Sequence, residues 1–222
     1  MNMNTIKNEY NLGIVGFGGM AGNHYKQLSK GNTKVKIKGV WDIDEKRLDA
    51  AREKGLIAYS SEEQILSDPE IDIILVSATN DVHKDIAIRA LAAGKHVLCE
   101  KSITLNSDEL DEAISLAEKN HVVLAEAMTI FHMPIYKALL EKVNSGDLGE
   151  LRLIQMNFGS YKEYNMNNRF FNRNLAGGAM LDIGVYALSF VRMFMSSCPN
   201  DVLSQVKYAE TGVDEQASIL LK

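Results

Sequence analysis

Cysteine is scarce in this chain of 222 residues. Cys99 and Cys198 are the two present, too few and too far apart for a disulfide framework or a four-ligand zinc site. Such sparse usage fits a reducing compartment. We therefore expect a cytoplasmic protein that folds without covalent or metal cross-links.

Long segments of a single chemical character are also lacking. Lys and Arg total 24 against 29 Asp and Glu, for a net charge of -5, and the sequence has no long basic block, which argues against nucleic acid as a partner. No apolar run approaches the roughly 18 residues of a membrane helix, and residues 1–10 lack the apolar core of a signal peptide. The sequence therefore predicts neither a nucleic-acid partner nor a membrane partner.

What is present is the composition of a soluble globular protein, 46% hydrophobic and 24% charged. The length suits one large domain or two modest ones. Over the first half, short apolar runs alternate with segments of helical periodicity, which is typical of βαβ units and a parallel sheet. Strands are expected over residues 12–17, 36–42, 71–78, 96–100 and 122–127, and helices over 82–93 and 107–120.

The pattern changes after residue 127. The later segments are a helix over 134–143, a half-buried strand over 151–158, a polar loop over 161–175, an apolar helix from 177 to about 195, and strands over 203–209 and 214–221. We therefore expect an α/β protein with a Rossmann domain over 1–127 and an α+β domain with an open, largely antiparallel sheet over 128–222. Because the chain stops inside a β pattern, we expect that sheet either to continue in a longer chain or to be covered by another chain.

A glycine-rich motif directly follows the first expected strand and precedes a helix. Its six residues, Gly16, Phe17, Gly18, Gly19, Met20 and Ala21, contain the G-x-G-x-x-A form of the dinucleotide-binding fingerprint. Gly16 permits a tight turn, Gly18 lets the backbone approach a pyrophosphate, and Ala21 keeps the helix close to the sheet. The plain alternative is a flexible turn. Asp42, at the end of the second strand, is where an acid should bind the adenosine ribose hydroxyls, whereas Asp44 could equally cap the next helix.

At this point the chain resembles the glucose-fructose oxidoreductase/inositol dehydrogenase (Gfo/Idh/MocA) superfamily of NAD(P)-dependent sugar and diol dehydrogenases. The resemblance rests on four stretches in the family's order, residues 16–21, 78–83, 93–101 and 177–186. The ending Asp182-x-Gly184-x-Tyr186 is similar to the branch of dihydrodiol and xylose dehydrogenases. Ser102 departs from the family's Glu-Lys-Pro, which has proline at that place.

The resemblance implies a set of site residues. It makes Lys101, Asp182 and Tyr186 catalytic, adds Thr79, Asn80, His83, Glu100 and Lys101 to the cofactor contacts, and points to His132, Tyr161 and Arg169 as substrate contacts. The residues alone support this in part, because Asp182 and Tyr186 are four apart and share a helix face. Simpler interpretations are a dipole-stabilising Asp, a core Tyr, and a solvent-exposed Lys101 paired with Glu100.

Several polar residues have equally plain alternatives. His83 could cap a helix or brace the cofactor loop, and His132 and Glu126 could serve packing alone. Tyr161, Tyr164 and Arg169 could belong to a solvated loop. No histidines stand at metal-ligand spacing, so no metal site is expected.

These observations together predict an oxidoreductase. Hydride would pass between nicotinamide and a carbinol carbon of a sugar, polyol or vicinal diol, while Tyr186 exchanges the hydroxyl proton, Lys101 favours the phenolate and Asp182 orients the group. NAD is expected over NADP because Asp42 would repel a 2′-phosphate, although Lys46 and Arg47 could offer a clamp. The resemblance implies a homo-dimer or higher homo-oligomer formed through the C-terminal sheet.

Two other functions compete with this prediction. The alternative from another class is a non-catalytic dinucleotide-binding regulator or scaffold. Redox hydrolysis of glycosides is disfavoured, because those relatives generally carry histidine where Tyr186 stands.

Overall fold

The chain forms two compact units, with the boundary between Ala127 and Met128, and each unit is described by itself. The structure is a computed structural model that describes residues 7–31 and 33–222. A candidate membrane span appears in the second unit, where the segment Arg173–Phe194 is long and apolar enough to cross a membrane. This differs from the expectation that no segment has such a character. The segment meets the requirements of a membrane span by length and composition only, and the core helix of a soluble protein meets the same requirements.

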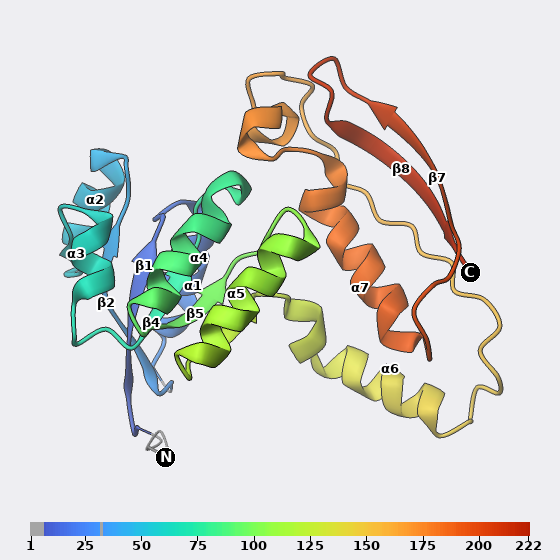
Figure 1. The fold of residues 1–222 in the computed structure, drawn as a ribbon, viewed down its shortest axis with the longest axis horizontal. Coiled ribbons are helices and arrows are strands. Elements are labelled where there is room, and N and C mark those ends of the chain that lie inside the picture. The colour runs from blue at the N-terminus through green and yellow to red at the C-terminus, as the bar shows by residue number, and fades with distance from the viewer. Residues whose placement is uncertain (1–6, 32) are drawn as a thin grey trace. The chain divides into compact units, whose positions relative to one another are not determined.

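A parallel sheet forms the first unit (Figure 1). Its six described strands are β1 Tyr10–Val15, β2 Val35–Trp41, β3 Ile57–Ala58, β4 Ile73–Val76, β5 His96–Cys99 and β6 Leu124–Glu126. They lie in the order β3-β2-β1-β4-β5-β6, so the direction of chain progression reverses between β1 and β4. The helices are α1 Gly19–Leu28, α2 Glu45–Arg52, α3 Glu62–Ser67, the 3₁₀ turn η1 Asn80–Val82, α4 His83–Ala92 and α5 Ser107–Lys119.

Helices cover both faces of this sheet. Neighbouring residues of a strand point to opposite faces, so Ile14 packs with α1 and α2 while Val15 packs with α3, α4 and α5. β4 divides in the same way, with Leu75 on the first face and Ile74 on the second. Both of these central strands are therefore apolar on both faces, as parallel strands usually are. The α/β class and the Rossmann sheet predicted from the sequence are confirmed.

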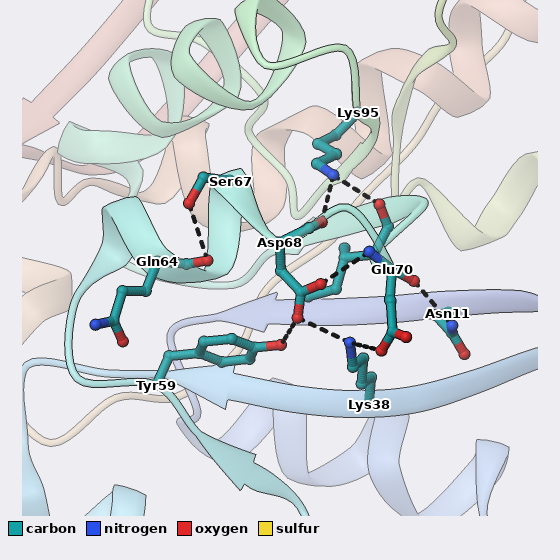
Figure 2. Close-up of polar contacts among 9 residues, drawn as sticks. Asn11, Lys38, Tyr59, Gln64, Ser67, Asp68, Glu70 and Lys95 are labelled. Carbon is teal, nitrogen blue, oxygen red and sulfur yellow. Dashed lines mark hydrogen bonds and ion pairs between the residues drawn. The ribbon is translucent and has the colours of Figure 1, made fainter.

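A cluster of polar side chains joins β2 to the loop before β4 (Figure 2). Lys38 Nζ donates to Asp68 Oδ2 at 2.8 Å and also to Glu70, and the Tyr59 hydroxyl donates to the same Asp68 oxygen. Hydrogen bonds from Lys38 and Tyr59 lower the pKa of Asp68 to about 2, whereas burial and the bond to Asp68 raise the pKa of Tyr59 to about 12. Lys95 Nζ donates to the backbone carbonyl of Asp68 at 2.6 Å. The cluster fixes the loop that leads into β4.

The two cysteines lie in opposite environments. Cys99, at the end of β5, is fully buried, and burial raises the pKa of its thiol. Cys198 is exposed.

The second unit combines helices with one antiparallel pair of strands (Figure 1). Its elements are η2 Thr129–His132, α6 Pro134–Asn144, the short turns η3 Arg169–Phe171 and η4 Arg173–Leu175, the π-helical turn η5 Met180–Gly184, α7 Val185–Phe194, β7 Val202–Tyr208 and β8 Asp214–Leu221. α6 packs on α7 through Tyr136 and Phe190, whose rings meet edge to face at 5.9 Å. β7 pairs with β8 from Val202 opposite Leu221 to Tyr208 opposite Asp214.

One expected strand is absent from the described residues. Residues 151–158 were expected to form a half-buried antiparallel strand, but they are irregular. Alternating polarity predicts a strand only if a neighbouring strand supplies backbone hydrogen bonds, and β7 and β8 bond to each other instead. The prediction for this segment was wrong.

Candidate functional site

The glycine turn after β1 lies at the carboxyl edge of the sheet. Gly16 has φ +89, and a Cβ there would lie 2.7 Å from backbone atoms of Ser77 and Ala78. Helix α1 begins at Gly19, and no side chain in the described structure caps its first amides. These amides can therefore face an anion, as the motif predicts.

The turn after β4 faces the same edge, next to β1. Among the described residues, the buried atoms Ser77 Oγ and Asp81 Oδ1 have no hydrogen-bond partner. Thr79 precedes η1, and Asn80 is buried. Ligands of such sheets bind where the strand order reverses, which here is between β1 and β4. A left-handed glycine, uncapped helix amides and unsatisfied polar atoms at this point fit a dinucleotide.

Asp42 follows β2 and braces the glycine turn. Its Oδ2 accepts from the Phe17 amide at 2.6 Å and from Arg47 at 3.1 Å, and its Oδ1 accepts from the Asp44 amide at 2.8 Å. The side chain is only 2% exposed. Contact with ribose hydroxyls stays a prediction, whereas the bracing contact was not anticipated. Asp44 caps α2 by accepting from the Lys46 amide, which was its alternative interpretation.

Glu100 leads into the segment that carries Lys101. Its backbone amide donates to Val76 in β4 at 2.9 Å. Its carboxylate is nearly buried, and Oε1 lies 2.6 Å from Nε2 of His24 in α1. The pair therefore links the helix at the glycine turn to the lysine segment. His24 was missed by the sequence analysis, because the two partners are 76 positions apart.

Residues after Lys101 are held by further side chains. His83 is 1% exposed, its Nδ1 lies 2.8 Å from the Ser102 carbonyl oxygen, and its Nε2 lies 3.2 Å from that of Ala78. Glu126 in β6 accepts from the Ile103 amide at 3.0 Å, and burial raises the pKa of Glu126. His83 thus braces the loop, one of its two expected roles, rather than capping α4. The peptide bond between Lys101 and Ser102 is cis.

In the second unit, the structure brings Asp182 and Arg169 together. Arg169 Nη2 lies 3.8 Å from Asp182 Oδ1, and its guanidinium stacks 4.1 Å from the centre of the Phe170 ring. Tyr186, in the first turn of α7, meets Phe158 edge to face at 6.0 Å. Asp182 and Tyr186 lie on consecutive helical turns, η5 and α7, as the spacing predicted.

The three expected substrate contacts lie in different surroundings within this unit. Tyr161 is 90% exposed and lines a cavity of about 1120 Å³ that is also lined by Asp182 and Glu215. Arg169 and His132 are exposed and do not line that cavity. Asp182 lines the cavity and also contacts Arg169, so it connects Arg169 with the cavity.

Comparison with known families decides the relationship. Residues 10–128 match the model described as "Oxidoreductase family, NAD-binding Rossmann fold", and residues 136–222 match the Gfo/Idh/MocA C-terminal domain. The chain belongs to the Gfo/Idh/MocA oxidoreductase family. Its first unit is accordingly an NAD-binding Rossmann domain, as predicted from the glycine motif.

The curated relatives of this family member include trans-1,2-dihydrobenzene-1,2-diol dehydrogenases. The protein from Xenopus laevis is 39% identical over 166 residues, which cover 74% of this chain and 50% of the relative. The mouse protein is 34% identical over 168 residues, 74% of this chain and 49% of the relative. The chain spans about half the length of the curated relatives it matches, and it resembles the branch that the sequence analysis indicated.

Solved structures share the fold. An NAD-binding protein from Listeria innocua is 30% identical, with a TM-score of 0.80 over 95% of this chain and 62% of the other. A 3-ketoreductase from Actinomadura kijaniata, in complex with NADP and TDP-benzene, has a TM-score of 0.84 at 20% identity, over 96% of this chain and 66% of the other. The second likeness concerns the fold alone.

Proposed function

We propose that this protein is an NAD(P)-dependent dehydrogenase that transfers hydride between nicotinamide and a carbinol carbon of a sugar, polyol or vicinal diol. The observation that carries the proposal is the arrangement of the carboxyl edge of the sheet. The Gly16 turn after β1, the unsatisfied polar atoms after β4 and the braced Lys101 segment after β5 follow three adjacent parallel strands. Their shared edge is the expected position of the dinucleotide.

The first unit would bind and orient the dinucleotide. The backbone amides of residues 16–21 would hold the pyrophosphate, Asp42 would lie beside the adenosine ribose, and Thr79, Asn80 and Glu100 would border the nicotinamide half. When bound, the nicotinamide supplies C4 as the hydride donor or acceptor. His24, His83 and Glu126 would hold the Lys101 segment in a fixed conformation, so that little reorganisation is needed when substrate arrives.

The second unit would supply the proton-transfer group. Tyr186 would take the proton from the substrate hydroxyl during oxidation and return it during reduction. A positive charge from Lys101 would favour the phenolate, and Asp182, steadied by Arg169, would orient the reacting group. Tyr161, Arg169 and His132 would contact the rest of the substrate.

The division of labour follows the two units. Residues 1–127 would bind the cofactor, and residues 128–222 would bind substrate and form a homo-oligomer through the sheet. Val202 and Leu203 of β7 are 58% and 61% exposed, which suits such an interface. We place the protein in the cytoplasm on the same proposal.

A substrate screen tests the function. Aldoses, polyols and vicinal diols are offered with NAD and with NADP, reduced nicotinamide is followed by absorbance, and dinucleotide affinity is measured separately by titration. Tyr186→Phe should lower turnover by about 10² to 10⁴ and leave dinucleotide affinity unchanged. Tyr208→Phe removes a hydroxyl from an exposed tyrosine of β7 and is the matched control.

Two outcomes would overturn the proposal. A chain that binds neither dinucleotide would contradict the cofactor site. A chain that binds dinucleotide but turns over none of the substrate classes would favour the non-catalytic regulator. Full turnover by Tyr186→Phe would leave the proposed hydride transfer intact. It would rule out Tyr186 as the proton-transfer group and make His132 the next candidate.

A further inference from the structure

Asp214, the first residue of β8, contacts the N-terminal end of the helix that carries Asp182 and Tyr186. The backbone amide of Met180 donates to Asp214 Oδ2 at 2.6 Å, across 34 positions of sequence. Met180 is the first residue of η5, so this amide is one of the donors that a helix leaves without an internal partner. The carboxylate also places a negative charge where the helix dipole favours it.

The glycine turn before the helix fits closely against this carboxylate. Gly178 has φ +123, and a Cβ there would lie 2.3 Å from Asp214 Oδ1. A Cβ on Gly177 would lie 2.6 to 2.9 Å from three carbonyl oxygens of residues 169–172. The turn is therefore enclosed on one side by Asp214 and on the other by the segment that carries Arg169.

The first turn of this helix is irregular, so a contact from another element can help to hold its position. η5 is a π-helical turn, a form that occurs in short pieces within α-helices. Asp182 is two residues beyond the amide that Asp214 holds, and its own amide donates to the Gly178 carbonyl at 3.1 Å. A displacement of Met180 would therefore rotate or shift Asp182 first and Tyr186 one turn later.

We infer that Asp214 is a positioning residue, which holds the first turn of this helix so that Asp182 and Tyr186 keep their aim toward substrate. The roles of Asp182 and Tyr186 toward substrate rest on the proposed function. The contact between Asp214 and the Met180 amide does not depend on that function. Geometry of this kind matters to rate, because a misplacement of about 1 Å in a reacting group can cost about 10²-fold.

The test compares two variants of the anchor with a cap elsewhere. Asp214→Ala removes the acceptor, and Asp214→Asn keeps an oxygen acceptor of the same shape without the charge. Ser61→Ala is the matched control, because Ser61 caps α3 in the first unit by accepting from the Gln64 amide at 3.2 Å. Asp214→Ser, with a shorter acceptor, serves if the alanine variant does not fold.

The first measurement needs no substrate. Tyr186 lies in the ring-current field of Phe158, so NMR signals of the Tyr186 ring, assigned with Tyr186→Phe, report its position. These signals should move in Asp214→Ala and stay in place in Asp214→Asn and Ser61→Ala. Unmoved signals in folded Asp214→Ala, or in Asp214→Ser where it replaces that variant, would overturn the inference whether or not the protein is a dehydrogenase.

The second measurement is the turnover of an active substrate from the screen. Asp214→Ala should lower kcat by about 10- to 100-fold, with dinucleotide affinity unchanged, while Asp214→Asn stays within about threefold of the parent. Equal loss of kcat in the alanine and asparagine variants, with Tyr186 signals in place, would show that charge rather than position matters and would contradict the inference. Loss of melting temperature in Asp214→Ala with unchanged kcat would reduce Asp214 to a stabilising cap.

Discussion

Replacing Asp68 with asparagine should weaken the first unit in a pH-dependent way. Asp68 accepts from Lys38 and Tyr59, and its side chain is 17% exposed (Figure 2). These contacts hold the pKa of the carboxyl at about 2, below its usual value of 3.8. By linkage, this difference corresponds to about 2 kcal/mol of stability at neutral pH.

The direction of the pH dependence follows from the lowered pKa. A carboxyl with a depressed pKa in the folded state contributes its full stability above about pH 5 and loses it as the pH falls below 4 toward 2. Asp68→Asn should therefore lower the free energy of unfolding by about 2 kcal/mol at pH 7 and by only about 1 kcal/mol near pH 3. The difference between the two proteins should shrink steadily below pH 5.

Urea denaturation followed by Trp41 fluorescence measures this difference. Trp41 is the single tryptophan and packs against the core of the first unit, so its signal reports the unit that contains Asp68. Glu70→Gln is the matched control, because Glu70 also pairs with Lys38 but is 73% exposed and should cost less than about 1 kcal/mol. A difference for Asp68→Asn that is constant from pH 7 to pH 3, or an equal cost for Glu70→Gln, would refute this reasoning.

Three further outcomes are expected. The pKa of Tyr59, raised to about 12 by burial and by its bond to Asp68, means that the protein should lose stability as the pH rises from 10 toward 12, and Tyr59→Phe should remove that loss in the same denaturation assay. Lys101→Met should depress turnover and move the alkaline limb of the oxidation profile to higher pH, because a charge that favours phenolate is gone; steady-state rates across pH measure this, and an unmoved limb would argue against the role of Lys101. NAD should bind more tightly than NADP, because Asp42 carries a negative charge beside the expected ribose; titration of both at equal ionic strength decides it, and tighter NADP binding would assign the adenosine end to Arg47 instead.

The Rossmann half of the fold was predictable from sequence because its signals are local. Buried parallel strands appear as short apolar runs, and the glycine motif marks the turn between β1 and α1. β3 and α3 escaped prediction, since a strand of two residues and a helix of six carry too little periodicity. Residues 151–158 show the converse, a strand-like pattern that finds no partner.

The site residues likewise divide into those with a local sequence signal and those without one. Gly16, Lys101 and Tyr186 belong to motifs that can be recognised in the linear sequence. His24 and Asp214 do not, because each acts on a group that only folding brings near, at 76 and 34 positions of separation. An isolated histidine in a helix or an aspartate at a strand end carries no local signal of such a partner.

Because one cysteine is buried and the other exposed, their rates of chemical modification can report how often the first unit opens. A thiol-specific reagent should modify exposed Cys198 at once, whereas Cys99, buried at the end of β5 with its thiol held protonated, should react only when the sheet separates. The slow phase of labelling would then report the rate of opening of the first unit at a native cysteine, with no engineered label. Because Cys99 adjoins Glu100 and Lys101, a bound dinucleotide that closes this edge would be seen directly as a longer interval between the two modifications.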